Sequence, residues 1–337
     1  MTTAGAPSGE DCRSVDVRSA ARVLAGGGLV AFPTETVYGL GARADDERAV
    51  AAIFATKGRP TDHPLIVHVA GPDQAATFAA AMPVVAQRLV AAFWPGPLTI
   101  IVPRAQGVAS GAAAGHPGIG LRCPSHPMAR ALLAEALALG VPGVAAPSAN
   151  RFGRISPTTA RHVREEFGPA LCILDGGPCA VGIESAIVDC TGEPAVLLRP
   201  GTLERSSIEA IAGDLRDPAG RPSHAAPGTL EAHYAPRARL RVMPAAALSA
   251  ALAAAPAPAS ALAVYSRTVP VSRSRSTAAL AAWRSMPEDA AAAARQLFAA
   301  LRELDRPGVA EIWVEAPPGT SAWDGVRDRL QRAAAAS

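Results

Sequence analysis

Two cations stand two residues apart near the start of this chain, at the expected end of a helix. They are Lys57 and Arg59. They follow an expected polar turn that contains two threonines, a glutamate and a tyrosine at residues 34–38 and is closed by Gly39 and Gly41. Ammonium and guanidinium groups beside small hydroxyls suit a polyanion such as a nucleoside triphosphate. The ordinary alternative is a capped turn beside a basic helix end, because cations complement the helix dipole. A lysine in this position is expected to bury little of its surface.

Other polar residues come at the ends of short apolar runs, where an open α/β sheet presents its ligand site. Arg122 ends the run that begins at Ile119, and its guanidinium suits either a carboxylate ligand or an interstrand ion pair. Small residues crowd the segment from Ala146 to Thr158, which is typical of a flexible loop or of close approach between a ligand and the backbone. The remaining polar residues of this kind are His63, His68, Ser148, Asn150, Ser156, Ser185 and Arg199.

The chain lacks several sequence motifs that are typical of particular kinds of nucleotide-binding or catalytic site. The chain has no GxxxxGKS or GxxxxGKT loop and no GxGxxG before a helix, so side-chain cations would hold a nucleotide. It also lacks the GxSxG motif of acyl-enzyme hydrolases. A net charge of +3 excludes a polybasic nucleic-acid coat but permits a basic pocket. The five cysteines form no CxxC pair, which indicates reduced thiols and no metal site.

The length of 337 residues predicts two domains. Apolar runs alternate with helical patterns from 15 to 203, and the later runs follow one another closely, which favours an α/β fold with a mixed sheet. Prolines and glycines gather between Ile211 and Pro236, so we place a linker at 204–237 and a smaller α/β domain at 238–337. The first domain is expected to fold alone when the chain ends at about Leu203. No signal peptide is visible, and prolines interrupt the alanine-rich stretch 245–264, so we expect a cytoplasmic protein without a membrane helix.

The expected strands are Leu29–Phe32, Leu65–Val69, Leu98–Val102, Ile119–Arg122, Val144–Ala146, Leu171–Leu174, Ala186–Asp189, Val196–Arg199, Leu240–Met243, Leu262–Tyr265 and Glu311–Val314. The expected helices are Asp45–Lys57, Val84–Phe93, Pro127–Leu139, Thr158–Phe167, Asp289–Leu304 and Trp323–Ala334.

Taken together, the motifs of the chain resemble those of one family. They read FPTETVYGLG, KGRPTDHPLIVHV, WPGPLT, LRCPSHPMA, APSAN, SPT, DGG, GIESAIVD and LLRPG, in the order found in threonylcarbamoyl-AMP synthases of the YrdC type. The resemblance covers about 15–201. The sequences PGTLEAHYAP at 227–236 and LFAALRELDRPG from Leu297 resemble the longer, two-domain subgroup. The family resemblance implies a twisted, open mixed sheet around a basic cleft, a Rossmann-like second domain, and a linker that folds over the cleft as a lid.

The resemblance also implies a reaction. A nucleotidyltransferase of this family joins L-threonine, bicarbonate or CO2, and ATP into threonylcarbamoyl-AMP and releases diphosphate. Mg2+ would arrive on ATP oxygens. A separate tRNA threonylcarbamoyl transferase complex would use the product on the adenosine beside the anticodon, with weak tRNA contact by this chain. The alternative is a non-catalytic protein that binds double-stranded RNA or tRNA, which the mild charge and the 4% aromatic content disfavour.

Residues are assigned to each ligand by the same resemblance. Lys57 and Arg59 would be catalytic, as the cations beside the departing diphosphate. Glu231 stands where this subgroup often has a tyrosine, so either Glu231 points outward or the lid contact moves to His233 or Tyr234. Threonine would contact Thr36, His68, Arg122, Ala146 and Ser185. ATP would contact Lys57, Arg59, His63, Ser148, Asn150, Ser156 and Arg199.

Overall fold

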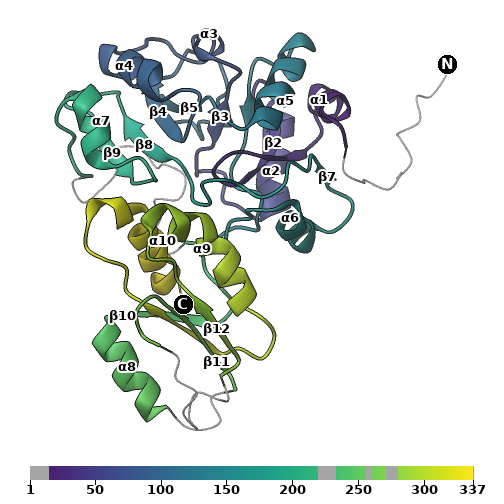
Figure 1. Ribbon diagram of the computed structural model, residues 1–337. Helices are drawn as coiled ribbons and strands as arrows, with labels where there is room; N and C mark the ends of the chain where they lie inside the picture. Colours follow the sequence, from purple (N-terminus) through teal and green to yellow (C-terminus); the bar gives the residue numbers. More distant parts are fainter. Residues whose placement is uncertain (1–14, 219–232, 256–259, 271–279, 337) are drawn as a thin grey trace.

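The computed structural model describes residues 15–218, 233–255, 260–270 and 280–336, which form two α/β units around separate sheets (Figure 1). The strands of the larger sheet are β1 (Val30–Pro33), β2 (Tyr38–Arg43), β3 (Ile66–His68), β4 (Leu98–Pro103), β5 (Gly118–Arg122), β6 (Val144–Ala145), β7 (Cys172–Ile173), β8 (Ala186–Asp189) and β9 (Val196–Arg199). They lie in the order β7-β1-β2-β6-β3-β5-β4-β8-β9. The sheet contains parallel pairs such as β3 with β5 and antiparallel pairs such as β4 with β5, so the predicted mixed sheet is confirmed.

Helices cover both faces of this sheet. Strand β1 shows why, because successive side chains of a strand point to opposite faces. Val30 and Phe32 pack into one apolar cluster with α1 and α5, whereas Ala31 packs into another with α2 and α4. The helices of this unit are α1 (Val17–Ala25), α2 (Glu47–Lys57), α3 (Pro72–Ala75), α4 (Val84–Phe93), α5 (Pro127–Ala138), α6 (Ala160–Phe167) and α7 (Arg205–Ala212).

The segment after β1 differs from the prediction. We expected one polar turn through Gly41, but the turn ends at Val37 and β2 then pairs antiparallel with β1. The Thr34 hydroxyl closes the turn by donating to the Val37 carbonyl oxygen at 2.7 Å. A Cβ on Gly41 would come 2.7 Å from the Val144 side chain, so this glycine permits close strand packing rather than a turn.

The second unit is a parallel sheet with helices on both faces. Its strands β10 (Arg239–Met243), β11 (Leu262–Ser266), β12 (Ala282–Ser285) and β13 (Glu311–Glu315) lie in the order β10-β13-β11-β12. The helices are α8 (Ala245–Ala254), α9 (Ala290–Leu304) and α10 (Asp324–Ala335), preceded by a 3-10 turn at Ser321–Trp323. Figure 1 shows α9 and α10 on the side of this sheet that faces the first unit, and α8 on the far side. The helices that carry Arg302 and Arg329 therefore form the seam between the units.

The region predicted as a linker begins with ordered structure. Helix α7 packs on α4, and Ile208 and Leu215 belong to the apolar core of the first unit. A chain ending at Leu203 would lose these two core residues, so we expect it to be less stable than a chain that keeps α7. Whether it folds alone stays a prediction. Residues 227–232 of the lid motif, Glu231 among them, lie outside the described residues. In the described ranges, no helix is both long enough and apolar enough to span a membrane.

Candidate active site

One cavity lies where the ends of several strands meet the seam between the units. It is small, at about 50 Å³, whereas pockets that hold drug-sized ligands measure roughly 300–1,000 Å³. A ligand of that size would therefore need the walls to move apart. Ten of the residues predicted for the site line this cavity: Thr36, Arg59, His68, Arg122, Ala146, Ser148, Ser185, Arg199, His233 and Tyr234.

Arg122 is buried at the end of β5 and makes two side-chain contacts with the turn after β1. Its guanidinium donates to the Thr36 hydroxyl at 2.9 Å and to the Glu35 carboxylate at 2.6 Å. Burial works to raise the pKa of Glu35, but Arg122 and the Ser125 amide lower it below its ordinary value. Arg122 thus has an ion-pair partner, although Glu35 lies in the turn after β1 and not on a strand as the alternative explanation expected. Arg122 still lines the cavity.

His68 lies beside Arg122, because β3 and β5 are parallel and these two residues are paired in register. The imidazole packs edge-on against Phe32 with ring centroids 5.8 Å apart. Burial, with a smaller contribution from Arg122, lowers the pKa of His68 to about 3. His68 is therefore neutral at pH 7, and its Nδ1 has no hydrogen-bond partner among the described residues.

The two predicted catalytic cations are placed differently. Arg59 lines the cavity, and burial lowers the pKa of its guanidinium to about 10. Lys57 is outside the cavity lining and only 3% exposed, so the expectation that it buries little was wrong. Its ammonium donates to the backbone oxygens of Ser148 and Asn150. Burial, followed by the charge of Arg59, lowers the pKa of Lys57 well below its ordinary value.

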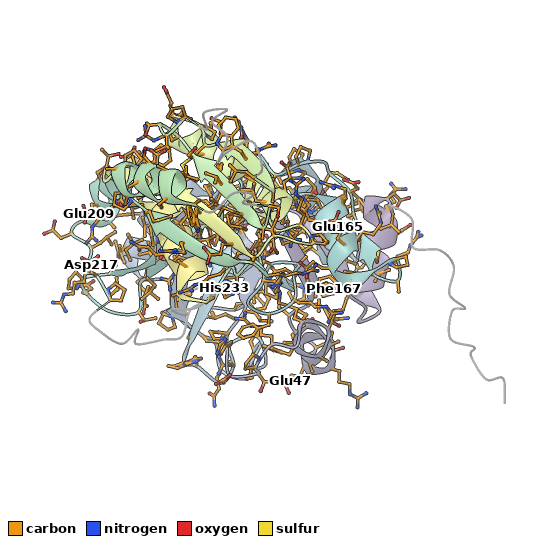
Figure 2. The ribbon with its side chains drawn as sticks, turned by 90° about the horizontal axis from the view of Figure 1, so that it is seen from below. Glu47, Glu165, Phe167, Glu209, Asp217 and His233 are labelled. Atoms are coloured by element: carbon orange, nitrogen blue, oxygen red, sulfur yellow. The ribbon has the colours of Figure 1, made fainter. Side chains whose placement is uncertain are left out.

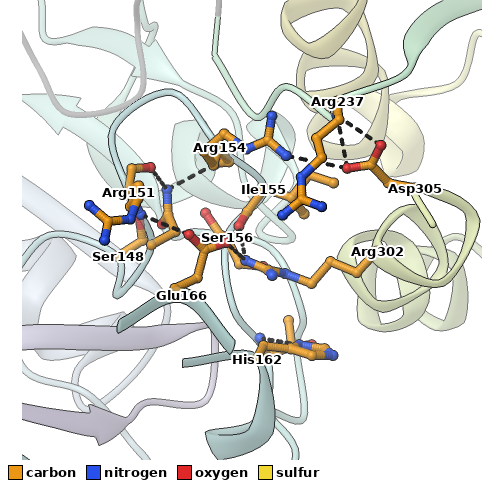
Figure 3. A network of polar contacts seen from close by, with 12 residues as sticks. Ser148, Arg151, Arg154, Ile155, Ser156, His162, Glu166, Arg237, Arg302 and Asp305 are labelled. Atoms are coloured by element: carbon orange, nitrogen blue, oxygen red, sulfur yellow. Dashed lines mark hydrogen bonds and ion pairs between the residues drawn. The ribbon is translucent and has the colours of Figure 1, made fainter. Parts of the chain in front are cut away.

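Residues 146–148 form part of the cavity wall, and the loop from Ser148 to Ser156 continues outside the lining. Asn150 donates to the carbonyl oxygens of Arg151 and Arg154, while its own side-chain oxygen has no partner in the described part of the chain. Figure 3 shows this loop beside Arg302, which reaches over from α9. Ser156 stands behind the lining, since it donates to the Glu184 carboxylate at 2.5 Å and Glu184 itself faces the cavity.

Ser185 and Arg199 form the opposite wall. The Ser185 hydroxyl pairs with that of Thr99 at 2.8 Å, and Arg199 reaches the backbone oxygen of Ser185 at 2.9 Å. Burial lowers the pKa of Arg199, as expected for a guanidinium that is only 2% exposed. Two buried guanidiniums, Arg59 and Arg199, thus line the cavity in addition to Arg122.

The lid residues His233 and Tyr234 lie inside the molecule. In Figure 2, His233 is near the middle of the view and Asp217 is at the periphery. His233 is 6% and Tyr234 1% exposed. Tyr234 packs against Phe298 of α9 at 5.4 Å between ring centroids. Its φ of 65° is uncommon for a residue with a side chain, and its hydroxyl has no partner within the described ranges.

The structure therefore brings most predicted residues together but not all of them. Lys57, His63, Asn150 and Ser156 lie outside the lining. The sequence interpretation missed Glu184, which was visible only as part of the motif around Ser185. Across the described residues, no three histidine, cysteine, aspartate or glutamate side chains are grouped to hold a metal ion.

The mixed sheet with a cationic cavity at its strand ends defines a YrdC-like α/β protein with a second, Rossmann-like unit. A family model described as "Telomere recombination" matches residues 22–201, and one described as "Threonylcarbamoyl-AMP synthase, C-terminal domain" matches 203–335. The chain belongs to the threonylcarbamoyl-AMP synthase family, which makes it an enzyme.

Curated relatives carry that name. The chain is 40% identical over 323 residues to a threonylcarbamoyl-AMP synthase of Pyrococcus abyssi, covering 94% of this chain and 93% of the relative. It is 42% identical over 232 residues to one of Bacillus subtilis, covering 67% of this chain and 66% of the relative.

Solved structures of the Pyrococcus abyssi protein Sua5 are also similar. The one complexed with L-threonine has a TM-score of 0.84 at 37% identity and covers 95% of this chain and 94% of that one. A variant with alanine in place of a histidine and the tyrosine next to it has a TM-score of 0.86 at 37% identity, covering 95% and 93%.

Proposed function

We propose that this enzyme makes threonylcarbamoyl-AMP from L-threonine, bicarbonate or CO2, and ATP, with release of diphosphate. The observation that supports this most is the cavity. Residues that the family resemblance assigns to threonine and to ATP come from separate strand ends and face one space. The likeness to a structure complexed with L-threonine supports the same substrate.

The geometry suggests how the residues divide the work. Arg122 and Thr36 hold the threonine carboxylate, and neutral His68 offers a hydrogen bond without adding charge. The threonine amine takes up bicarbonate as a carbamate, with loss of water. A carbamate oxygen then attacks the α-phosphate of ATP, and the bond to diphosphate breaks. Arg59 and Arg199 stabilise the phosphate charge that develops, so no covalent enzyme intermediate is needed.

In the conformation of this structure, Lys57 supports the site indirectly, through the loop that it holds. Its ammonium fixes the loop that carries Ser148 and Asn150 by holding their backbone oxygens. Movement of that loop on ATP binding would bring the charge of Lys57 to the phosphates. His63, on the outer side of Arg59 near Phe152, would take part only at the edge of the nucleotide.

Mg2+ would enter with ATP. Glu184 is the one carboxylate among the described residues that line the cavity, and it already accepts hydrogen bonds from Ser156 and Arg329. Mg2+ prefers several oxygen ligands in octahedral geometry. The carboxylate of Glu184 already has hydrogen-bond donors and is one oxygen-bearing side chain where Mg2+ needs several ligands. This supports a metal ion that is bound mainly by the triphosphate and not by protein side chains.

The product would be labile, so its handling matters. His233 and Tyr234 lie against the cavity and would act as a lid that keeps water from the adenylate. A cytoplasmic tRNA threonylcarbamoyl transferase complex would then receive the product, and weak tRNA contact would aid the transfer.

The test is incubation with ATP, L-threonine and bicarbonate, followed by mass detection of the adenylate and assay of diphosphate. We expect diphosphate release to require threonine and bicarbonate together. Release that ignores threonine would contradict the proposal. Steeply salt-dependent tRNA binding without turnover would favour the alternative, an RNA-binding protein.

A further inference from the structure

Glu184 of the first unit and Arg329 of α10 form a buried ion pair across the seam. Arg329 donates from Nε to the Glu184 carboxylate at 2.9 Å and from Nη2 to the Glu184 backbone oxygen at 3.0 Å. It also donates to the Pro200 carbonyl oxygen at 2.7 Å and to Asp328 at 2.8 Å. Arg329 is 0% exposed and Glu184 8%, so solvent screens this pair little.

The position of Glu184 is unusual for a site that must receive a polyanion. Glu184 lines the cavity together with Arg59 and Arg199. Burial works to raise its pKa, yet Arg329 and Arg199 lower that pKa below its ordinary value, so Glu184 carries a negative charge. An unpaired carboxylate there would repel the phosphates of ATP. The second unit supplies Arg329, which offsets this charge more than Arg199 of the first unit does.

The same contacts fix a residue that the family resemblance assigns to ATP. Ser156 donates to the other Glu184 oxygen at 2.5 Å. Arg302 of α9 donates to the backbone oxygens of Ile155 and Ser156 and pairs with Glu166 at 2.9 Å (Figure 3). Two arginines of the second unit thus hold the segment that carries Ser156.

We infer that Arg329 and Glu184 are positioning residues for ATP, so that the second unit sets both the charge and the geometry of the phosphate side of the site. This inference rests on the proposed function. Neither residue needs to touch a reacting atom: Arg329 acts through Glu184, and Glu184 acts through Ser156 and through the charge that it would expose if unpaired.

The test compares single and double variants in the full chain. Arg329→Gln leaves Glu184 unpaired, so the ATP Kd and KM should rise about tenfold or more, whereas the threonine KM should change less than about threefold. Glu184→Gln removes the repelling charge, and its amide oxygen still accepts from Ser156. It should leave the ATP KM unchanged or lower it. The double variant should return to within about threefold of the wild type.

Arg327→Gln is the matched control, because it removes the same charge from the same helix at a site outside the cavity lining. Its KM values should match the wild type. Urea unfolding shows which variants are folded. If Arg329→Gln does not fold, Glu184→Gln and the double variant decide the question.

Three results would overturn the inference: equal rises in both KM values for Arg329→Gln, no recovery in the double variant, or a tenfold rise in the ATP KM for Glu184→Gln alone. ATP binding by calorimetry, without threonine, separates this outcome from failure of the proposed function. A wild type that binds ATP but makes no adenylate refutes the function and still permits the comparison of variants.

Discussion

The ammonium of Lys57 donates to the backbone oxygen of Ser148 at 2.6 Å, which joins the end of α2 to a loop 91 residues further along the chain. Among the described residues, its ammonium donates to the backbone oxygens of Ser148 and Asn150, so this buried lysine holds the loop in place. Removal of Lys57 takes this donor from the Asn150 backbone oxygen, whereas the Ser148 backbone oxygen still accepts from the Asn150 amide at 3.0 Å. A buried acceptor left without a donor costs about 1–3 kcal/mol.

Lys57→Ala should lower both turnover and stability. We expect kcat to fall about 100-fold or more, because the loop that carries Ser148 and Asn150 loses its support and the phosphates lose a nearby cation. The free energy of unfolding should fall by about 1–3 kcal/mol. Diphosphate release and urea unfolding measure the two effects. Arg48→Ala, at an exposed position of the same helix, should change neither.

Arg122→Lys should affect threonine more than ATP. The lysine keeps the charge but cannot contact Thr36, Glu35 and a carboxylate ligand through one planar fork. We expect the threonine KM to rise about tenfold and the ATP KM less than about threefold. The control is Arg130→Lys, on the exposed side of α5. An equal rise in both KM values would indicate a purely structural role.

His68 should make the protein less stable in acid. Its pKa is about 3 in the fold and about 6.5 when unfolded, so between these values the unfolded state binds more protons. Stability from this group is complete above pH 6.5 and falls as the pH drops towards 3. When the pH falls from 7 to 5, the free energy of unfolding of the wild type should fall by about 2 kcal/mol more than that of His68→Gln. Urea unfolding at the two pH values measures this difference. His116→Gln, outside the cavity, is the comparison; equal losses in His68→Gln and wild type would contradict this pKa.

Tyr234→Phe should separate binding from stability. The Tyr234 hydroxyl is buried without a partner among the described residues, so its removal should change the unfolding free energy by less than about 1 kcal/mol. If substrates give this hydroxyl its partner, the ATP or threonine KM should rise several-fold. Tyr265→Phe removes a second hydroxyl of the same kind in β11, outside the cavity lining. It should leave both KM values unchanged, and identical kinetics for the two variants would exclude a ligand contact at Tyr234.

The fold was largely predictable because apolar runs mark its strands. The run before Pro33 predicted β1 to within one residue at each end. Strand β2 was missed because Gly39 and Gly41 look like turn residues, while their actual role is to let Phe32 and Ala146 come close. That role depends on the neighbouring strands, which local sequence does not show.

The candidate site was less predictable where long-range contacts define it. Arg122 was found because it ends an apolar run. Glu184 was missed because its charge matters only beside Arg329, which is 145 residues away in sequence. The burial of Lys57 was missed for the same reason, since its acceptors belong to a loop formed much later in the chain.

The seam has a consequence for how the molecule comes apart. Arg329 and Tyr234 are buried and Arg302 is half-buried at the seam, so separating the units would leave charged and polar groups that neither unit can satisfy alone. We therefore expect the two units to unfold together as one cooperative unit. In scanning calorimetry the chain should melt in one transition with equal calorimetric and van't Hoff enthalpies, although its sequence divides into two families of domain.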